Sequence, residues 1–299
     1  MKKVIIGLML AAAVFTANRP QEDTSAMTDG YIPVAQEGRI YYRIEGRGEP
    51  LILLHGHSLD MRMWEPQMQA LTSQYRVIRI DFRGYGQSSG MREDLHTTHL
   101  DDLLTVMDSL HIERAHIVGL SMGGFVAGDM VGMHPERMLS CVMSSGAVRQ
   151  SHPSVNDPMT EAERHKADST AWAHVNYGLE RLRQEWIDGL VEHGGSRRES
   201  IREALQQIIG DWDGWQLDHV EPHLYYGHEA MDSLRARRPE VPTLYLSGET
   251  EHKKRSGMLD YLPNGQQVEL PDCGHMSNME QPELWNEAVL EFLCSVSRR

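Results

Sequence analysis

A serine, a histidine and two glutamates stand where they could form a nucleophilic catalytic centre. Ser121 lies in the segment GLSMGG, residues 119–124, between an apolar stretch and a helical pattern. This is the context of a nucleophile elbow, a sharp strand-to-helix turn that pushes the serine hydroxyl clear of a sheet. Gly119 and Gly123, which lack side chains, relieve the crowding of such a turn. Ser121 is therefore the candidate nucleophile.

A serine nucleophile needs a base, and the base needs an acid that orients it. His275, in DCGHMSNMEQPE, follows one predicted strand and precedes the last predicted helix. Glu249 and Glu251, in SGETEH, follow the strand before it, so the chain order is Ser, acid, His, as expected for such an elbow. We expect His275 to be the base. Either glutamate could be the acid, and an acid after the strand that ends near Ser145 is a third possibility.

Backbone N–H groups near the same position could stabilise a developing oxyanion. The segment HGHS, residues 55–58, follows an apolar strand and supplies the N–H of His57. Together with the N–H of Met122 it could form an oxyanion hole, in which each donor contributes about 2.7–4 kcal/mol to transition-state stabilisation.

The elements that would position these groups alternate between strands and helices. Residues 30–56 predict three short strands, and the later strands alternate with helical patterns: YIPVA, RIYYRIEG, PLILLHG, RVIRID, AHIVG, MLSCVMSSG, PTLYLSG and QQVEL. Continuous apolar strands indicate burial on both faces. The sequence therefore predicts an α/β protein with a mostly parallel sheet that helices cover on both sides.

A long helical insertion interrupts this alternation. We expect residues 27–147 and 239–299 to form the α/β core and residues 148–238 to form a helical cap. The cap range is rich in aromatic residues: Trp172, Trp186, Trp212, Trp215, Tyr177, Tyr225 and Tyr226. These rings form either the small core of the insertion itself or the roof of an apolar pocket, since ligand sites favour aromatic linings.

The N-terminus has the layout of a secretory signal peptide. Lys2 and Lys3 precede an apolar run over residues 4–17, and a polar stretch follows. A membrane-spanning helix needs about 18 or more apolar residues, so an anchor is the less favoured interpretation. We predict that residues 1–26 are signal peptide and leader, cut within residues 13–26, and that the mature protein is exported, periplasmic or secreted, without stable membrane insertion.

Composition narrows the possible partners. The chain has 299 residues, with 29 Lys and Arg against 43 Asp and Glu, a net charge of −14. An acidic surface repels the phosphate backbone, so we expect no nucleic-acid partner. Three cysteines allow at most one disulfide, and buried packing is the favoured interpretation. The oligomeric state is not predicted.

A metal centre is the first competing interpretation, because His55, His57 and Asp60 lie close together in the sequence. The pattern H-x-H-x-D would need Asp at the position of Leu59, and no H-E-x-x-H occurs. We therefore predict neither a metal nor any other cofactor.

Five segments give the chain a resemblance to the α/β-hydrolase family: LILLHGHSLDMRMW, IRIDFRGYGQSS, IVGLSMGG, PTLYLSGE and GHMSNMEQPE. The resemblance implies that Ser121 is the nucleophile, His275 the base, and the N–H groups of His57 and Met122 the oxyanion hole. The insertion falls where the family carries its cap. Glu251 stands where the family usually has the acidic Asp, which favours it over Glu249. For the loop DFRGYGQSS the resemblance implies a mainly structural role.

The form GLSMGG is similar to the elbows of esterases, enol-lactonases and cofactor-free perhydrolases. We therefore predict a serine hydrolase that cleaves a small-molecule carboxylic ester or lactone through an acyl-enzyme. The alternatives are a perhydrolase or haloperoxidase, an aminopeptidase-like hydrolase on the same triad, and a binding protein without catalytic activity. The natural substrate cannot be predicted from these residues.

Overall fold

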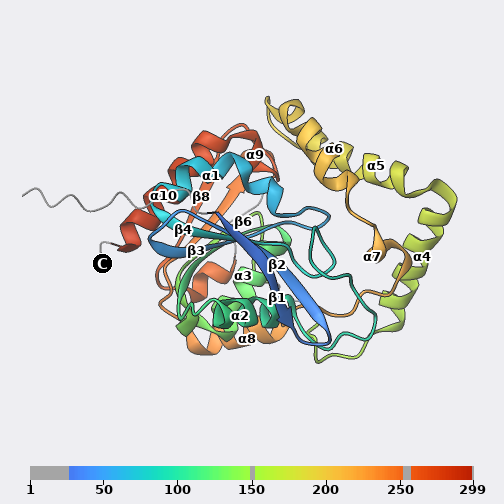
Figure 1. The fold of residues 1–299 in the computed structure, drawn as a ribbon, viewed down its shortest axis with the longest axis horizontal. Helices are drawn as coiled ribbons and strands as arrows, with labels where there is room; N and C mark the ends of the chain where they lie inside the picture. Colours follow the sequence, from blue (N-terminus) through green and yellow to red (C-terminus); the bar gives the residue numbers. More distant parts are fainter. Residues whose placement is uncertain (1–26, 149–151, 252–256, 298–299) are drawn as a thin grey trace, which may run out of the picture.

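An eight-stranded sheet runs through the centre of the protein in the order β1-β2-β4-β3-β5-β6-β7-β8 (Figure 1). In this computed structural model residues 27–148, 152–251 and 257–297 are described. The strands are β1 Thr28–Val34, β2 Gly38–Glu45, β3 Glu49–Leu54, β4 Tyr75–Ile80, β5 Ala115–Leu120, β6 Met138–Ser144, β7 Thr243–Gly248 and β8 Gly265–Leu270. Only β2 pairs antiparallel, with β1 and with β4, and every other pair is parallel. The predicted α/β fold with a mostly parallel sheet is confirmed.

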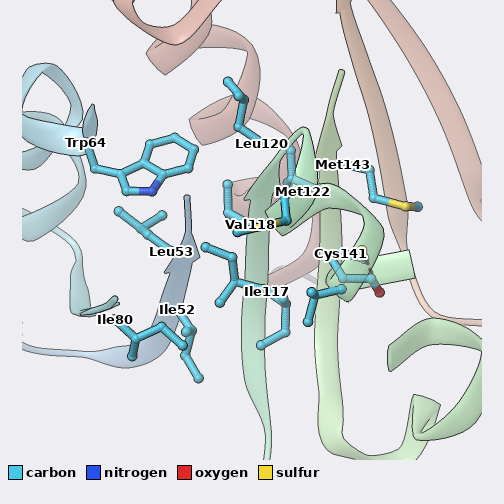
Figure 2. Packing of buried hydrophobic residues seen from close by; sticks show 14 of the residues in the cluster. Ile52, Leu53, Trp64, Ile80, Ile117, Val118, Leu120, Met122, Cys141 and Met143 are labelled. Carbon is cyan, nitrogen blue, oxygen red and sulfur yellow. Dashed lines mark hydrogen bonds between the residues drawn. The ribbon is translucent and has the colours of Figure 1, made fainter. Parts of the chain in front are cut away.

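Helices cover both faces of this sheet (Figure 1). On one face lie α1 Glu65–Thr72, α9 Ser277–Glu280 and α10 Pro282–Ser297, and on the other α2 His99–Ser109, α3 Met122–Met133 and α8 His228–Arg237. All six residues of β5 are buried, as the unbroken apolar pattern predicts. Figure 2 shows Ile52 and Leu53 of β3 near Ile117 and Val118 of β5 in this core.

The insertion between β6 and β7 carries α4 Glu161–Tyr177, α5 Leu179–Glu192, α6 Arg202–Gly210 and α7 Trp215–Asp218. These four helices, called the cap below, extend beside the sheet rather than over it (Figure 1). Short 3-10 turns complete the chain: η1 Met61–Trp64, η2 Pro135–Arg137, η3 Arg198–Ile201, η4 Glu249–Glu251 and η5 Gly257–Tyr261.

Helix α8 falls within residues 148–238, the range predicted as cap, but it packs on helix α3 of the core. A Cβ atom at Gly132 of α3 would lie 2.4 Å from the carbonyl oxygen of Ala230, so the two helices meet closely because glycine stands there. The Ser233 hydroxyl donates a hydrogen bond to the Gly132 carbonyl at 2.6 Å. The insertion therefore returns to the core before β7 begins.

Three further predictions concern the termini and the cysteines. The predicted signal peptide, residues 1–26, lies outside the described residues. Among the helices that the structure describes, none has the length and apolar character needed to cross a membrane. Cys141 and Cys273 are buried, Cys294 is partly exposed, and all three are free thiols.

Candidate active site

The turn between β5 and α3 holds Ser121 in a conformation that side chains rarely adopt. Its φ of 52° and ψ of −110° lie in a strained region for any residue other than glycine. The surroundings hold this turn in place, since the Ser121 N–H donates to the Ser144 carbonyl at 2.8 Å and the Gly123 N–H donates to the His55 carbonyl at 3.0 Å. Strain at a position so firmly held is typical of a functional site.

The two glycines of GLSMGG are explained by close backbone approach. A Cβ atom at Gly119 would lie 2.1 Å from the Gly123 carbonyl oxygen, and one at Gly123 would lie 2.1 Å from the Leu54 carbonyl oxygen. No side chain fits at either position. The spacing of the motif therefore follows from how tightly α3 packs against β3 and β5.

A histidine and a carboxylate meet beside this turn. His275, in the loop between β8 and α9, lies with its Nδ1 2.8 Å from Oε1 of Glu251. The other carboxylate oxygen, Oε2, accepts hydrogen bonds from the Ser145 hydroxyl at 2.7 Å and the Gly248 N–H at 3.3 Å. Only 6% of the Glu251 side chain is exposed. A carboxylate on Nδ1 selects the tautomer whose Nε2 is free to accept a proton.

The second candidate acid points elsewhere. Glu249 is exposed, and its Oε2 accepts a hydrogen bond from the Asp272 N–H at 2.9 Å. The structure therefore brings Glu251 to His275 and leaves Glu249 to hold the loop. Among the described residues, no acid from the third expected position, after β6, meets His275. Ser145 stands there with a left-handed φ of 54° and supports Glu251 instead.

Ser121 and His275 line one small cavity of about 20 Å³, which His57 also lines. The strand ends explain why His57 and Ser121 meet, because β3 and β5 are parallel neighbours, with Leu54 opposite Gly119, and their carboxyl ends lie at the same edge. Met122 is the first residue of α3, so its N–H cannot bond within the helix and lies at the positive end of the helix dipole. The loop after β3 thus brings His57 to the same edge as Ser121 and Met122.

A larger cavity of about 750 Å³ opens from Ser121 toward the cap. Trp186 and Trp212 line it, and their rings meet the His57 ring with centroids 6.0 and 5.5 Å away. Trp172 is 59% exposed and lies outside the lining. Of the aromatic residues in the predicted cap range, Trp186, Trp212 and Tyr225 therefore line the cavity, whereas Trp172 does not.

Comparison with known proteins agrees with this arrangement of sheet, elbow and cap. The family model of the alpha/beta hydrolase fold matches residues 49–282. The chain belongs to the α/β-hydrolase family. The match runs from the start of β3 to the start of α10, so it includes Ser121, Glu251 and His275.

Several α/β-hydrolases are similar to the chain over most of its length. A 2-hydroxy-6-oxononadienedioate/2-hydroxy-6-oxononatrienedioate hydrolase from Burkholderia vietnamiensis is 29% identical, over 90% of this chain and 97% of that protein. The 3-oxoadipate enol-lactonase 1 of Acinetobacter baylyi is 26% identical, over 79% of this chain and 85% of its own. The structure of a thermophilic esterase from Thermogutta terrifontis superposes with a TM-score of 0.70 at 25% identity, covering 90% and 99% of the two chains.

Part of the lining of the α/β-hydrolase cavity is charged. Glu163, Lys166 and Glu221 line it, and Glu163 also receives His223 Nε2 at 3.1 Å. The Glu221 side chain opens on the cavity, and desolvation raises its pKa to about 7, although the Lys166 ammonium acts in the opposite direction. Polar ligand groups can therefore be accommodated in this cavity.

His55 and Asp60, on which the competing metal interpretation depends, make other contacts. His55 Nε2 accepts the Phe82 N–H at 2.9 Å, and its Nδ1 faces the Gly56 carbonyl at 2.8 Å. Asp60 pairs with Arg62 at 2.6 Å. In the described part of the chain, no three His, Cys, Asp or Glu side chains are arranged to hold a metal ion.

Sequence reasoning missed two residues that touch this site. Ser145 supports the acid, and Tyr85, in the loop DFRGYGQSS, lies with its hydroxyl 2.6 Å from Nδ1 of His57. The resemblance assigned that loop a mainly structural role. Only the register of β4 and β3, which are parallel neighbours, could have indicated that Tyr85 reaches the loop after β3.

Proposed function

We propose that this α/β-hydrolase is a serine hydrolase that cleaves carboxylic esters or lactones through an acyl-enzyme intermediate. The observation that carries the proposal is the contact between His275 and Glu251, in a loop that shares a cavity with the strained Ser121. A nucleophile, a base and an orienting acid are the parts that acyl transfer requires.

In the first half of the reaction, Ser121 Oγ attacks the substrate carbonyl while His275 Nε2 takes the hydroxyl proton. Glu251 holds the ring and stabilises the imidazolium, and the N–H groups of His57 and Met122 donate to the oxyanion. The tetrahedral intermediate collapses as His275 returns the proton to the departing alkoxide. In the second half, water gives a proton to His275 and attacks the acyl-enzyme, which releases the carboxylic acid and restores the Ser121 hydroxyl.

The similarity to an enol-lactonase and to an esterase supports an ester or lactone as the substrate. The similarity to the hydrolase from Burkholderia vietnamiensis supports a second candidate on the same residues, hydrolysis of a carbon–carbon bond next to a ketone. Formation of a peracid by hydrogen peroxide in place of water would also use this triad.

The proposal is tested by trapping the nucleophile and by a substrate panel. A fluorophosphonate should label the native protein once, and peptide mapping should place the label on Ser121. Acyl p-nitrophenyl esters of graded chain length are compared with lactones, amino-acid amides and peroxide with acetate, and we expect the highest kcat/KM for an ester or lactone. Turnover without labelling at Ser121, or amides or peroxide as better substrates, would overturn it.

We also propose that the chain is exported, on the basis of the two lysines and the apolar run that follows them. N-terminal sequencing of protein from the native cell envelope or medium should find a first residue within 14–27. Intact Met1 on that protein would count against export by a cleaved signal.

A further inference from the structure

The side chain of His57 occupies the junction of the two cavities. Its ring lines both the small cavity at His275 and the large cavity under the cap. Around it stand Tyr85, Trp186 and Trp212, each in an edge-on contact with ring centroids 5.5–6.0 Å away. A substrate whose carbonyl lies at Ser121 would therefore extend past this ring.

Both partners of the His57 contact are neutral at neutral pH. Burial lowers the pKa of His57 to about 4, and the neighbouring His55 acts in the same direction. Burial also raises the pKa of Tyr85 well above its ordinary value. The phenol O–H is a stronger acid than an imidazole N–H, and an imidazole nitrogen is a stronger base than a phenol oxygen. Tyr85 therefore donates its hydrogen to Nδ1 of His57.

This assignment leaves the ring proton of His57 on Nε2. No group of the described residues bonds Nε2, and this atom is not sealed from solvent. Because the ring lines both cavities, the Nε2–H opens onto them as a donor without a partner. It belongs to the residue whose backbone N–H we assign to the oxyanion hole, so it lies close to the acyl group.

We propose that His57, held by Tyr85, determines specificity: its Nε2–H donates a hydrogen bond to an oxygen of the acyl chain near the scissile carbonyl. The preferred substrates are then esters or lactones whose acyl group bears an oxo, hydroxyl, alkoxy or carboxylate oxygen within two or three atoms of that carbonyl. A plain alkyl chain leaves the donor without an acceptor, and a site built to hydrogen-bond an oxygen discriminates against analogues without it. The inference rests on the proposed serine hydrolase reaction.

The first experiment compares two p-nitrophenyl esters of equal length, the methoxyacetate and the butyrate. The ratio of their kcat/KM values is measured in the wild type, in His57→Phe, which keeps a ring and the backbone N–H, and in Tyr85→Phe. The intrinsic reactivities of the esters cancel between variants. We expect the ratio to fall about tenfold in His57→Phe, the size of one neutral hydrogen bond, and by less in Tyr85→Phe.

Tyr75→Phe is the matched control, because it also removes the hydroxyl of a buried tyrosine. Tyr75 lies on β4 next to His116, and it lines neither cavity. It should leave the ratio unchanged. If His57→Phe keeps the wild-type ratio while esters are still cleaved through Ser121, then His57 only packs against its neighbours, and the inference fails without the proposed function.

The second experiment reads the tautomer directly and does not depend on activity. Nitrogen NMR of protein labelled in histidine should show a His57 signal with the proton on Nε2 in the wild type, which changes in Tyr85→Phe. A proton on Nδ1 would mean that His57 donates to Tyr85 and offers no donor to substrate, which would overturn the inference. Absence of labelling at Ser121 would instead remove the proposed function.

Discussion

The core and the cap of this α/β-hydrolase both contain helices and tryptophans, but the core buries them and the cap leaves many of them exposed. Helix α3 of the core is buried along almost its whole length, whereas none of the described side chains of cap helix α4 is buried. In the core, Trp64 and Trp285 are fully buried and pack together with ring centroids 5.5 Å apart. In the cap, Trp172 is 59% exposed. Packing therefore restricts each side chain in the core to few conformations, whereas side chains in the cap can adopt many.

This difference assigns different tasks to the two regions. Strain at Ser121 persists only where the surroundings over-determine the backbone, as the core does. In the proposed reaction the inserted segment contributes walls rather than reacting groups, since Trp186 and Trp212 line the cavity while Glu251 and His275 come from loops of the core. If the comparison holds, changes in the core should cost catalysis and changes in the cap should alter selectivity.

The largest effect should follow removal of the nucleophile from the core. Ser121→Ala should lower kcat by about 10⁶, the scale observed when a triad serine is removed. The fold should survive, because the proposed function assigns the hydroxyl to the reaction rather than to packing, and a denaturation curve checks this. Retention of more than a tenth of the esterase activity would place the nucleophile elsewhere and contradict the assignment of catalysis to the core.

The next effect separates the two glutamates of η4. Glu251→Gln should lower kcat by about 10⁴, because the amide cannot hold His275 in the required tautomer as a carboxylate does. Glu249→Gln is the matched control on the same turn and should cost about tenfold or less, since among the described residues the Glu249 carboxylate bonds only the Asp272 N–H. Kinetics of both variants with one good ester decide between them, and the reverse ranking would transfer the acid to Glu249.

The buried histidines of the core should make stability depend on pH. Burial lowers the pKa of His55 to about 4 and that of His99 to about 3, against an ordinary value of 6.5. Below pH 6.5 these histidines bind protons in the unfolded chain but stay neutral in the folded core. The free energy of unfolding should therefore fall as pH decreases toward 4. Each histidine contributes a slope of about 1.4 kcal/mol per pH unit. Asp81 and Glu221 oppose this below about pH 6 and pH 7, because desolvation raises their pKa values to about 6 and about 7. His57, whose pKa is lowered to about 4, adds to the fall.

Urea denaturation at several pH values between 4.5 and 7 measures this slope. His99→Phe keeps the ring contacts with Phe82 and Tyr225 and removes a ring whose Nε2 has no partner among the described residues, so the slope should decrease by about 1.4 kcal/mol per pH unit. His165→Asn, on the exposed face of α4, should leave the slope as it is. Equal slopes in wild type and His99→Phe would show that the core admits a charged histidine.

The structure of the core could be predicted from the sequence to a greater extent than that of the cap. The strands and the elbow were predictable because continuous apolar runs and the glycines at 119 and 123 admit few other structures. The pairing of His275 with a carboxylate after β7 was expected, but Glu249 and Glu251 differ only in where a single turn directs them. Tyr85 was missed because its partner is distant in the chain.

In the cap, pattern alone could not separate rings that line a cavity from rings that face solvent. Trp172 and Trp186 both lie in helical patterns beside charged residues. Their surroundings depend on what each helix packs against: Trp186 of α5 meets His57, whereas α4 packs on α7 and α5. Helix α8 shows the same limit, since its sequence does not say that it packs on Gly132 rather than on the cap.

The smallest expected effect tests those rings directly. Trp212 is 8% exposed, lines the cavity and meets the His57 ring, so Trp212→Leu should enlarge the acyl pocket. The ratio of kcat/KM for p-nitrophenyl octanoate to that for the butyrate should change by about tenfold in favour of the longer chain, the scale on which a few methylene contacts discriminate. Trp172→Leu is the matched control: its ring lies outside the lining, so the ratio should stay within about twofold of the wild type. An unchanged ratio in a folded Trp212→Leu protein would mean that the cap rings pack only among themselves and set no limit on substrate size.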